Sequence, residues 1–404
     1  MSMTGFPDAL RLLCREAGGD VDRVLAIACG PAPAWDPVVY LADYSRMVLY
    51  PLSQGVAEED VAGTMAGRAF TTEQPVVGQS SQSSQSGQSG QSGQSGDGQR
   101  VWVPVLEQTN CTGVLALTIP EATEEALEQA ALLGVFAGLV TALVVRVSDT
   151  PQLRRRGTQL SLPASMQWDL LPPLSARTNS AVIAGILEPA YDIAGDAFDY
   201  AISDSGLQFA VIDGMGHGIG STLLTGLAVG AYRHARRAGE PLSAMHVAID
   251  YALDAYYQDL SFATGILARL DAVSGRLEWS CAGHPRPLLL RGRKVVSELA
   301  CEAGLPFGLG GPAPQPAVED LEPGDAVLLY TDGVVEARTP AGEQFGLERL
   351  IDLAERAAAS GQHAEELIRR LVRAVLDHQA GELRDDATLL LVQWIKSAVS
   401  DPVP

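Results

Sequence analysis

Apolar and polar residues alternate in two different ways along the chain, and the first pattern covers residues 1–148. Val101–Leu106 and Thr112–Ile119 are short apolar runs of strand length, separated by a polar turn. Glu121–Val147 follows as a long apolar run with a polar, acidic start, which predicts a long helix. We therefore expect a small α/β module in this part of the chain.

The second pattern begins near Ala181, where strand-like runs end in turns at short intervals. Ser274 and Gly275 separate two such runs as a hairpin turn does. Helix-like segments are interleaved with the strands at Ser221–Arg237, Ala244–Tyr257, Leu347–Ala358 and Ala364–His378. Hairpin strands with helices grouped between them favour an α+β sandwich over alternating βαβ units.

Two further segments do not follow either pattern. Residues 79–98 form a Gln/Ser/Gly repeat that lacks apolar side chains to bury, so we expect a solvated loop. Residues 149–178 form a connector whose apolar residues around Trp168 are compatible with a helix. That helix either carries a signal between domains or packs passively on the second one. The expected organisation is 1–148, a regulatory domain; 149–178, a connector; 179–396, the α+β domain; and 397–404, a tail.

The charge balance limits the partners of the protein. The chain has 28 Lys and Arg against 49 Asp and Glu, a net charge of −21. Nucleic acids and anionic membrane surfaces attract basic patches, so neither is an expected partner. The five cysteines are scattered without a C-x-x-C or Cys/His cluster, which argues against zinc and fits reduced thiols in the cytoplasm. Ala130–Val145 is shorter than the roughly 20 residues of a membrane span, so we favour a buried or dimerising helix.

Acidic residues recur where the predicted strands of the second domain meet loops. The positions are Asp196, Asp213, Asp332 and the pair Asp385 and Asp386. A single Asp-Gly step is an ordinary turn. Several acidic strand ends in one domain instead predict a site for divalent cations, because gathered carboxylates repel one another without them. Oxygen ligands indicate Mg²⁺ or Mn²⁺, and two such ions can activate water against a phosphoryl group.

The order of motifs in the second domain resembles the SpoIIE/RsbU-type branch of the PP2C (PPM) serine/threonine phosphatases. The matching pieces are MQWDLLPP, AGDAFDY, AVIDGMGHG, CAGHPRPLLL, GLPFGLG, LEPGDAVLLYTDGVVEAR, FGLERL and DDATLLLV. The resemblance implies an αββα sandwich with a two-metal site at one edge. One departure is Ala194, where the family usually has a glycine.

The same resemblance implies roles for single residues. Asp213 would bridge two Mn²⁺ or Mg²⁺ ions, and Gly214 would offer its backbone carbonyl. Asp332 and Asp385 would complete the second site, Asp196 would serve the first, and Asp386 stands where the wider superfamily often has Asn. The remaining candidates are His217 as a proton carrier, and His284 as either a residue that shapes the site or a structural turn histidine.

The first domain resembles GAF-type sensor domains more loosely, through the run from Gly67 to Val77 and the strand pair after it. An interaction module without a ligand is the alternative. The combined expectation is a cytoplasmic phosphatase that acts on a phosphorylated STAS-type anti-anti-sigma factor. A small-molecule or protein signal at residues 1–148 would regulate it, with dimerisation through the long helix. The rivals are a non-catalytic regulator with the phosphatase fold and a ligand sensor that acts by protein–protein interaction.

Overall fold

This computed structural model describes residues 6–15, 21–29, 36–78, 98–188, 191, 195–257, 261–361, 363–380 and 385–396. Of the Gln/Ser/Gly repeat only Gly98 is among them, and the tail at 397–404 lies outside them. The chain forms two compact units, Met1–Gln159 (the N-terminal unit) and Leu160–Pro404 (the C-terminal unit). The division falls inside the predicted connector.

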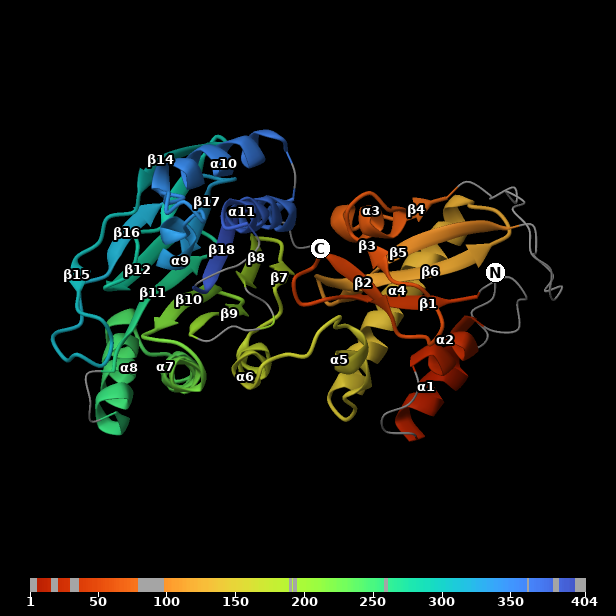
Figure 1. Ribbon diagram of the computed structural model, residues 1–404, viewed down its shortest axis with the longest axis horizontal. Coiled ribbons are helices and arrows are strands. Elements are labelled where there is room, and N and C mark those ends of the chain that lie inside the picture. Colours follow the sequence, from red (N-terminus) through yellow and green to blue (C-terminus); the bar gives the residue numbers. More distant parts are fainter. Residues whose placement is uncertain are drawn as a thin grey trace, which may run out of the picture. The chain divides into compact units, whose positions relative to one another are not determined.

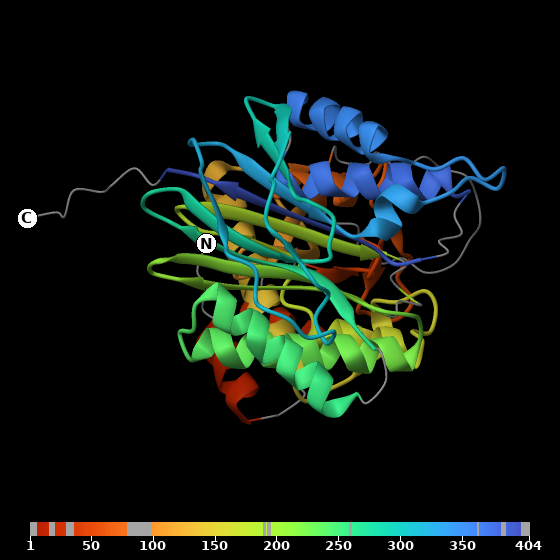
Figure 2. The ribbon, with the colours of Figure 1, turned by 90° about the vertical axis from the view of Figure 1, so that its left-hand side faces the viewer.

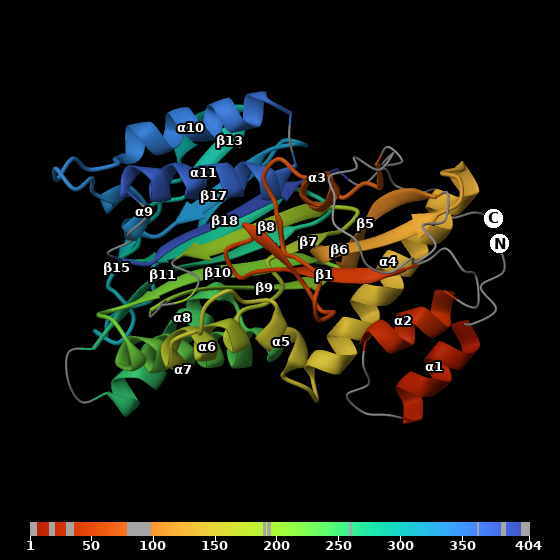
Figure 3. The same cartoon turned by 45° about the vertical axis from the view of Figure 1, so that its right-hand side comes forward.

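The N-terminal unit is built on one sheet, with strand order β3-β2-β1-β6-β5-β4. The helices α1, α2 and α4 cover one face of this sheet and α3 packs on the other (Figure 3). The bounds are α1 Phe6–Arg15, α2 Val21–Cys29, β1 Val38–Ala42, β2 Val48–Pro51, β3 Glu59–Asp60, α3 Met65–Thr72, β4 Val76–Val77, β5 Gln99–Glu107, β6 Asn110–Ile119, α4 Glu124–Val145 and α5 Thr150–Arg154. The predicted α/β module is confirmed, and its likeness to GAF domains stays a prediction.

Helix α4 is long and apolar enough to cross a membrane by length and composition, with a mean hydropathy of 1.9. Half of that apolar window is buried within the unit. Gly138 allows α4 to pack closely on β5, because a Cβ at this position would lie 2.0 Å from the Leu106 carbonyl oxygen. The outward face carries Leu132, Leu139 and Leu143, each about half exposed at 56%, 51% and 55%. The predicted helix is present with one face buried, and dimerisation through its outward face stays a prediction.

The C-terminal unit contains two sheets, with strand orders β14-β13-β17-β18-β8-β7 and β15-β12-β11-β10-β9, and β16 also pairs with β12 (Figure 1). We call them the first and second sheet. The bounds are α6 Leu162–Leu170, β7 Ser175–Arg177, β8 Ala181–Glu188, β9 Asp196–Ser203, β10 Gly206–Gly214, α7 Ile219–Arg237, α8 Leu242–Tyr256, β11 Ala263–Asp271, β12 Arg276–Ala282, β13 Leu288–Arg291, β14 Lys294–Glu298, β15 Ala303–Gly304, β16 Ala317–Asp320, β17 Ala326–Tyr330, α9 Asp332–Glu336, α10 Leu347–Ala359, α11 Ala364–His378 and β18 Ala387–Trp394.

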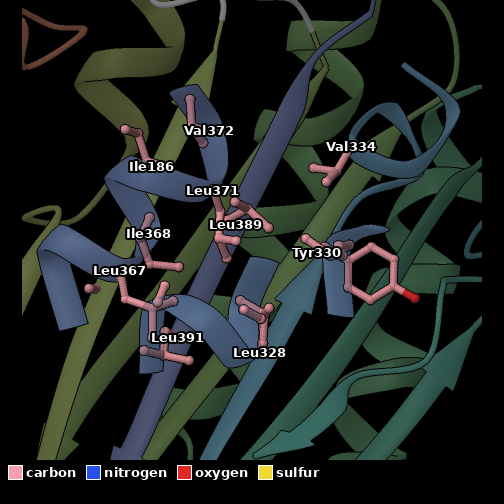
Figure 4. Packing of buried hydrophobic residues seen from close by; sticks show 14 of the residues in the cluster. Ile186, Leu328, Tyr330, Val334, Leu367, Ile368, Leu371, Val372, Leu389 and Leu391 are labelled. Atoms are coloured by element: carbon pink, nitrogen blue, oxygen red, sulfur yellow. The ribbon is translucent and has the colours of Figure 1, made fainter. Parts of the chain in front are cut away.

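These elements form four layers, helices–sheet–sheet–helices (Figure 2). Side chains of both sheets, including Phe209 and Leu390, share the central core. Helices α7 and α8 cover the outer face of the second sheet. Helix α11 packs on the first sheet, where its apolar residues meet those of β8, β17 and β18 (Figure 4). The predicted αββα sandwich is confirmed.

The connector contributes a helix to this unit. Gln167 of α6 is fully buried, and Trp168 and Leu171 pack against the central core. Arg233 of α7 donates to the Leu170 carbonyl over 2.6 Å and to the Asp199 carboxylate over 2.7 Å. Helix α6 therefore packs on the C-terminal unit, which is one of the two alternatives that the sequence left open. A signalling role of α6 stays a prediction.

Candidate active site

The topology brings the acidic residues from both sheets to one edge of the sandwich. In the second sheet, Asp196 on β9 lies directly opposite Asp213 on β10. In the first sheet, Asp332 follows β17 and Asp385 precedes β18, and these two strands are paired. Thr331 joins the two sheets, because its hydroxyl donates to Asp196 Oδ2 over 2.7 Å. Residues more than 100 positions apart thus share one site.

Asp196 is held by polar groups on all sides. Its backbone N–H donates to Asp386 Oδ2 over 3.4 Å, and its backbone carbonyl accepts a hydrogen bond from Gln167 Nε2. The side chain is 2% exposed. Burial, followed by the charges of Asp213 and Asp386, raises the pKa of Asp196 well above its usual value, against hydrogen bonds from two threonines.

The carboxyl group of Asp213 interacts electrostatically with each of the other acidic residues of the site. Burial raises its pKa to about 7, with further contributions from Asp332, Asp385 and Asp386. A hydrogen bond from the Thr264 hydroxyl acts in the opposite direction. Asp213 is partly buried and is surrounded by other carboxylates, and no positively charged residue among those described compensates its negative charge. This electrostatic arrangement is typical of a cation site.

Asp332 and Asp385 are exposed, whereas Asp386 is half-buried. Burial is also the main cause that raises the pKa of Asp385, followed by the charges of Asp332 and Glu336. Asp332 and Gly333 form the start of α9, which lies against the chain before β18. A Cβ at Gly333 would lie 1.9 Å from the Asp386 carbonyl oxygen, so only glycine allows this approach. Glycine is therefore required at 333, where α9 begins beside the site, and the Asp332-Gly333 step opens a helix instead of forming an ordinary turn.

A cavity of about 420 Å³ opens between these residues. Its walls are Asp213, Gly214, Met215, Gly216, His217, Phe262, Thr264, Asp332 and Asp385. His217 is exposed at the wall, which leaves it accessible as a proton carrier. The Gly214 carbonyl accepts a hydrogen bond from Ser221 Oγ over 2.6 Å. The cavity is large enough for a phosphoryl group between the carboxylates.

The oxygen ligands suit divalent cations, although the described residues do not form a complete coordination site. Among the described residues, no three His, Cys, Asp or Glu side chains converge on a single ion position. The ligands on offer are carboxylate and carbonyl oxygens, which suit Mg²⁺ and Mn²⁺ rather than zinc. Cations between Asp213, Asp332 and Asp385 would relieve the repulsion that raises the pKa of Asp213. The roles of single residues as ligands stay predictions.

Sequence reasoning missed the neutral residues that hold the acids. Gln167, Thr264 and Thr331 all contact Asp196 or Asp213. Thr331 is next to Asp332 in the sequence, and Gln167 lies within the MQWDLLPP motif. Their positions in these motifs could therefore have identified both residues. Thr264 lies in an ordinary strand, and only the register β10–β11 reveals it opposite Asp213.

A sandwich of two sheets with an acidic edge defines the class of the C-terminal unit as PP2C-like. Residues 203–395 match the family model described as Stage II sporulation protein E (SpoIIE), so this part of the chain is a SpoIIE-type, PP2C-like domain. The resemblance seen in the motifs is confirmed.

The chain is also similar to curated proteins, over part of its length. It is 24% identical over 272 residues to Protein IcfG of Synechocystis sp., covering 60% of this chain and 40% of that protein. It is 25% identical over 240 residues to Phosphoserine phosphatase RsbU of Bacillus subtilis, covering 58% of this chain and 70% of RsbU. Among solved structures, the RsbU and RsbW domains of Rv1364c from Mycobacterium tuberculosis share 28% identity over 56% of this chain and 63% of theirs, with a TM-score of 0.49.

Proposed function

We propose that the C-terminal unit is a metal-dependent protein phosphatase that hydrolyses phosphoserine or phosphothreonine. The observation that carries the proposal is the gathering of Asp213, Asp332 and Asp385 around one cavity, with Asp196 directly opposite Asp213 on the neighbouring strand. The similarity to a protein named phosphoserine phosphatase supports the same chemistry. An intact set of carboxylates speaks against the rival, a regulator that keeps the fold without catalysis.

In this proposal Asp213 would serve both cations, Asp332 and Asp385 would help to hold one of them, and Asp196 would serve the other. When bound, two Mn²⁺ or Mg²⁺ ions polarise a phosphoryl group and lower the pKa of water. The chain itself supplies orientation: Thr331 fixes the Asp196 carboxylate, and Met215 and Phe262 border the cavity. His217, exposed at the wall of the cavity, would donate a proton to the departing serine oxygen.

The test is release of phosphate from a phosphoserine peptide, with and without Mn²⁺. We expect Mn²⁺-dependent release by the full chain, and a loss of at least about 100-fold in Asp213→Asn, because its carboxylate is the shared ligand. Asp204→Asn, at an exposed hairpin of the same unit, is the matched control and should keep full activity. No release by the intact chain in Mn²⁺ or Mg²⁺ would favour the non-catalytic regulator.

The substrate we propose is a phosphorylated STAS-type anti-anti-sigma factor in a partner-switching pathway. Support comes from the family match and the similarity to RsbU. Incubation of the full chain and Mn²⁺ with phosphoproteins from the same cell, followed by phosphosite mapping, identifies the substrate. A dephosphorylated site outside any STAS protein would contradict this assignment while leaving the phosphatase activity intact.

We further propose that the N-terminal unit regulates the phosphatase in the cytoplasm. A cavity of about 610 Å³ lies in this unit beside α4 and α5. Phe136, Leu139, Val140 and Leu143 supply much of its apolar wall, and Glu107 and Arg155 lie at its polar part. Such a cavity suits a small-molecule signal. The half-exposed leucines of α4 offer an alternative, a protein contact such as a homodimer.

A further inference from the structure

Exposed apolar side chains lead from the wall of the cavity onto helix α7. Met215 belongs to the wall and is 44% exposed, and its N–H donates to the Phe262 carbonyl over 3.0 Å, so these two wall residues are neighbours. Helix α7 begins at Ile219, which is 48% exposed, and Leu223 in its next turn is 50% exposed. We call Met215, Ile219 and Leu223 the apolar strip. It begins at the site and continues along the outer helix layer of the unit (Figure 2).

The outward side of α7 next to the strip carries no charge. From Gly214 to Tyr232 the chain contains no Asp, Glu, Lys or Arg, although 19% of all residues in the protein are charged. The solvent side of a surface helix is normally lined with charged and polar side chains. An outward side that instead presents half-exposed apolar side chains indicates a surface that another molecule covers.

Two glycines on the same side of α7 support this interpretation. Gly226 and Gly230 follow Ile219 and Leu223 at helical spacing, so all four residues share one side of the helix. Glycine weakens a helix relative to alanine. Within the part of the chain that the structure describes, no atom lies within 4 Å of a Cβ placed at either glycine, so internal packing does not require them. Glycines here instead allow a partner to approach the helix backbone closely.

We propose that the apolar strip is the docking surface for the phosphoprotein substrate, and that it selects phosphoserine segments flanked by large apolar side chains. Met215 belongs to both the cavity wall and the strip, so the residues beside a phosphoserine held in the cavity come within reach of Ile219 and Leu223. Acidic flanking residues are disfavoured by the carboxylates of the site, and the uncharged strip offers basic ones no partner. The inference rests on the proposed function in placing the phosphoryl group in this cavity.

The test compares two phosphoserine peptides of equal length, one with leucines flanking the phosphoserine and the other with glutamines. With the full chain and Mn²⁺, the leucine peptide should have a KM about tenfold lower, because its side chains bury the exposed parts of the strip. The double substitution Ile219→Gln and Leu223→Gln should remove this preference. It should leave turnover of p-nitrophenyl phosphate unchanged, since that substrate occupies only the cavity. Equal KM values for the two peptides, or a preference that survives the double substitution, would overturn the inference.

Val273→Gln is the matched control and should keep the preference for leucine. Val273 is 81% exposed beyond the other end of β11, about 25 Å from the cavity end of that strand. Faster turnover of p-nitrophenyl phosphate in the double variant would assign the strip to an inhibitory contact within this chain and overturn the inference.

Two further measurements separate this inference from its alternatives. Sedimentation of the full chain tests a second copy as the occupant: a dimer that the double substitution dissociates, with the leucine preference retained, would overturn the inference. Fluorescence anisotropy with phosphonate analogues of the two peptides measures the preference without turnover. The docking surface therefore remains testable if the chain hydrolyses no phosphoester, and the two proposals fail separately.

Discussion

At the scale of single residues, the acidic cluster makes metal binding sensitive to pH. Burial and three neighbouring carboxylates raise the pKa of Asp213 to about 7 in the metal-free chain. Below that pH the carboxyl is mostly protonated, and a cation must displace the proton. We therefore expect the apparent Mn²⁺ affinity to fall about fivefold between pH 7 and pH 6. Calorimetry in two buffers of different ionisation enthalpy should also show proton release, and pH-independent binding would contradict this account.

His284 makes the free energy of unfolding sensitive to pH. Its folded pKa, about 4, lies below the unfolded value of 6.5, so stability is fully present above pH 6.5 and falls as the pH drops toward 4. The full shift corresponds to about 3 kcal/mol. Because the carboxyl groups of the acidic cluster also respond to pH, the useful quantity is the difference in unfolding free energy between wild type and His284→Asn, measured in urea with EDTA. A difference in unfolding free energy that does not change with pH would contradict the lowered pKa of His284.

At the scale of elements, a buried hydrogen bond couples α6 to the metal-site strand β9. Gln167 is fully buried and its Nε2 donates to the Asp196 carbonyl. Gln167→Met keeps the side-chain length but leaves that carbonyl without its donor, which costs about 1–3 kcal/mol of unfolding free energy. Gln393→Met is the matched control, since Gln393 donates to the exposed Gly324 carbonyl over 3.1 Å. Equal losses in urea unfolding of the C-terminal unit would show that burial of the bond is irrelevant.

The elements were also the part of the structure that the sequence predicted best. Helices α7, α8, α10 and α11 begin and end within two residues of the predicted ranges, because their apolar periodicity is strong. Strand β9 was not predicted from Asp196 onward, since its first four residues are buried and give no alternation to detect. Thr264 and Gln167 reach the acids through sheet register and packing over long sequence separations, and local pattern cannot reveal such contacts.

At the scale of the whole molecule, the contacts of α6 determine where the phosphatase unit must start. The predicted domain began at residue 179, whereas the compact unit begins at Leu160. A fragment of residues 160–404 retains α6, β7 and the buried Leu174, and should unfold cooperatively and bind Mn²⁺ like the full chain.

A fragment of residues 179–404 loses the burial of Leu174, the edge strand β7 and the Gln167 bond to Asp196. A buried leucine contributes about 1.5–3 kcal/mol and the hydrogen bond about 1–3 kcal/mol, so the shorter fragment should be at least about 2.5 kcal/mol less stable. Its Mn²⁺ affinity should fall as well, because Asp196 loses the contact that fixes its backbone. Urea unfolding and Mn²⁺ titration of the two fragments measure both effects. Equal stability and equal affinity would mean that α6 is a linker, and that regulation by the N-terminal unit cannot act through the Gln167 contact.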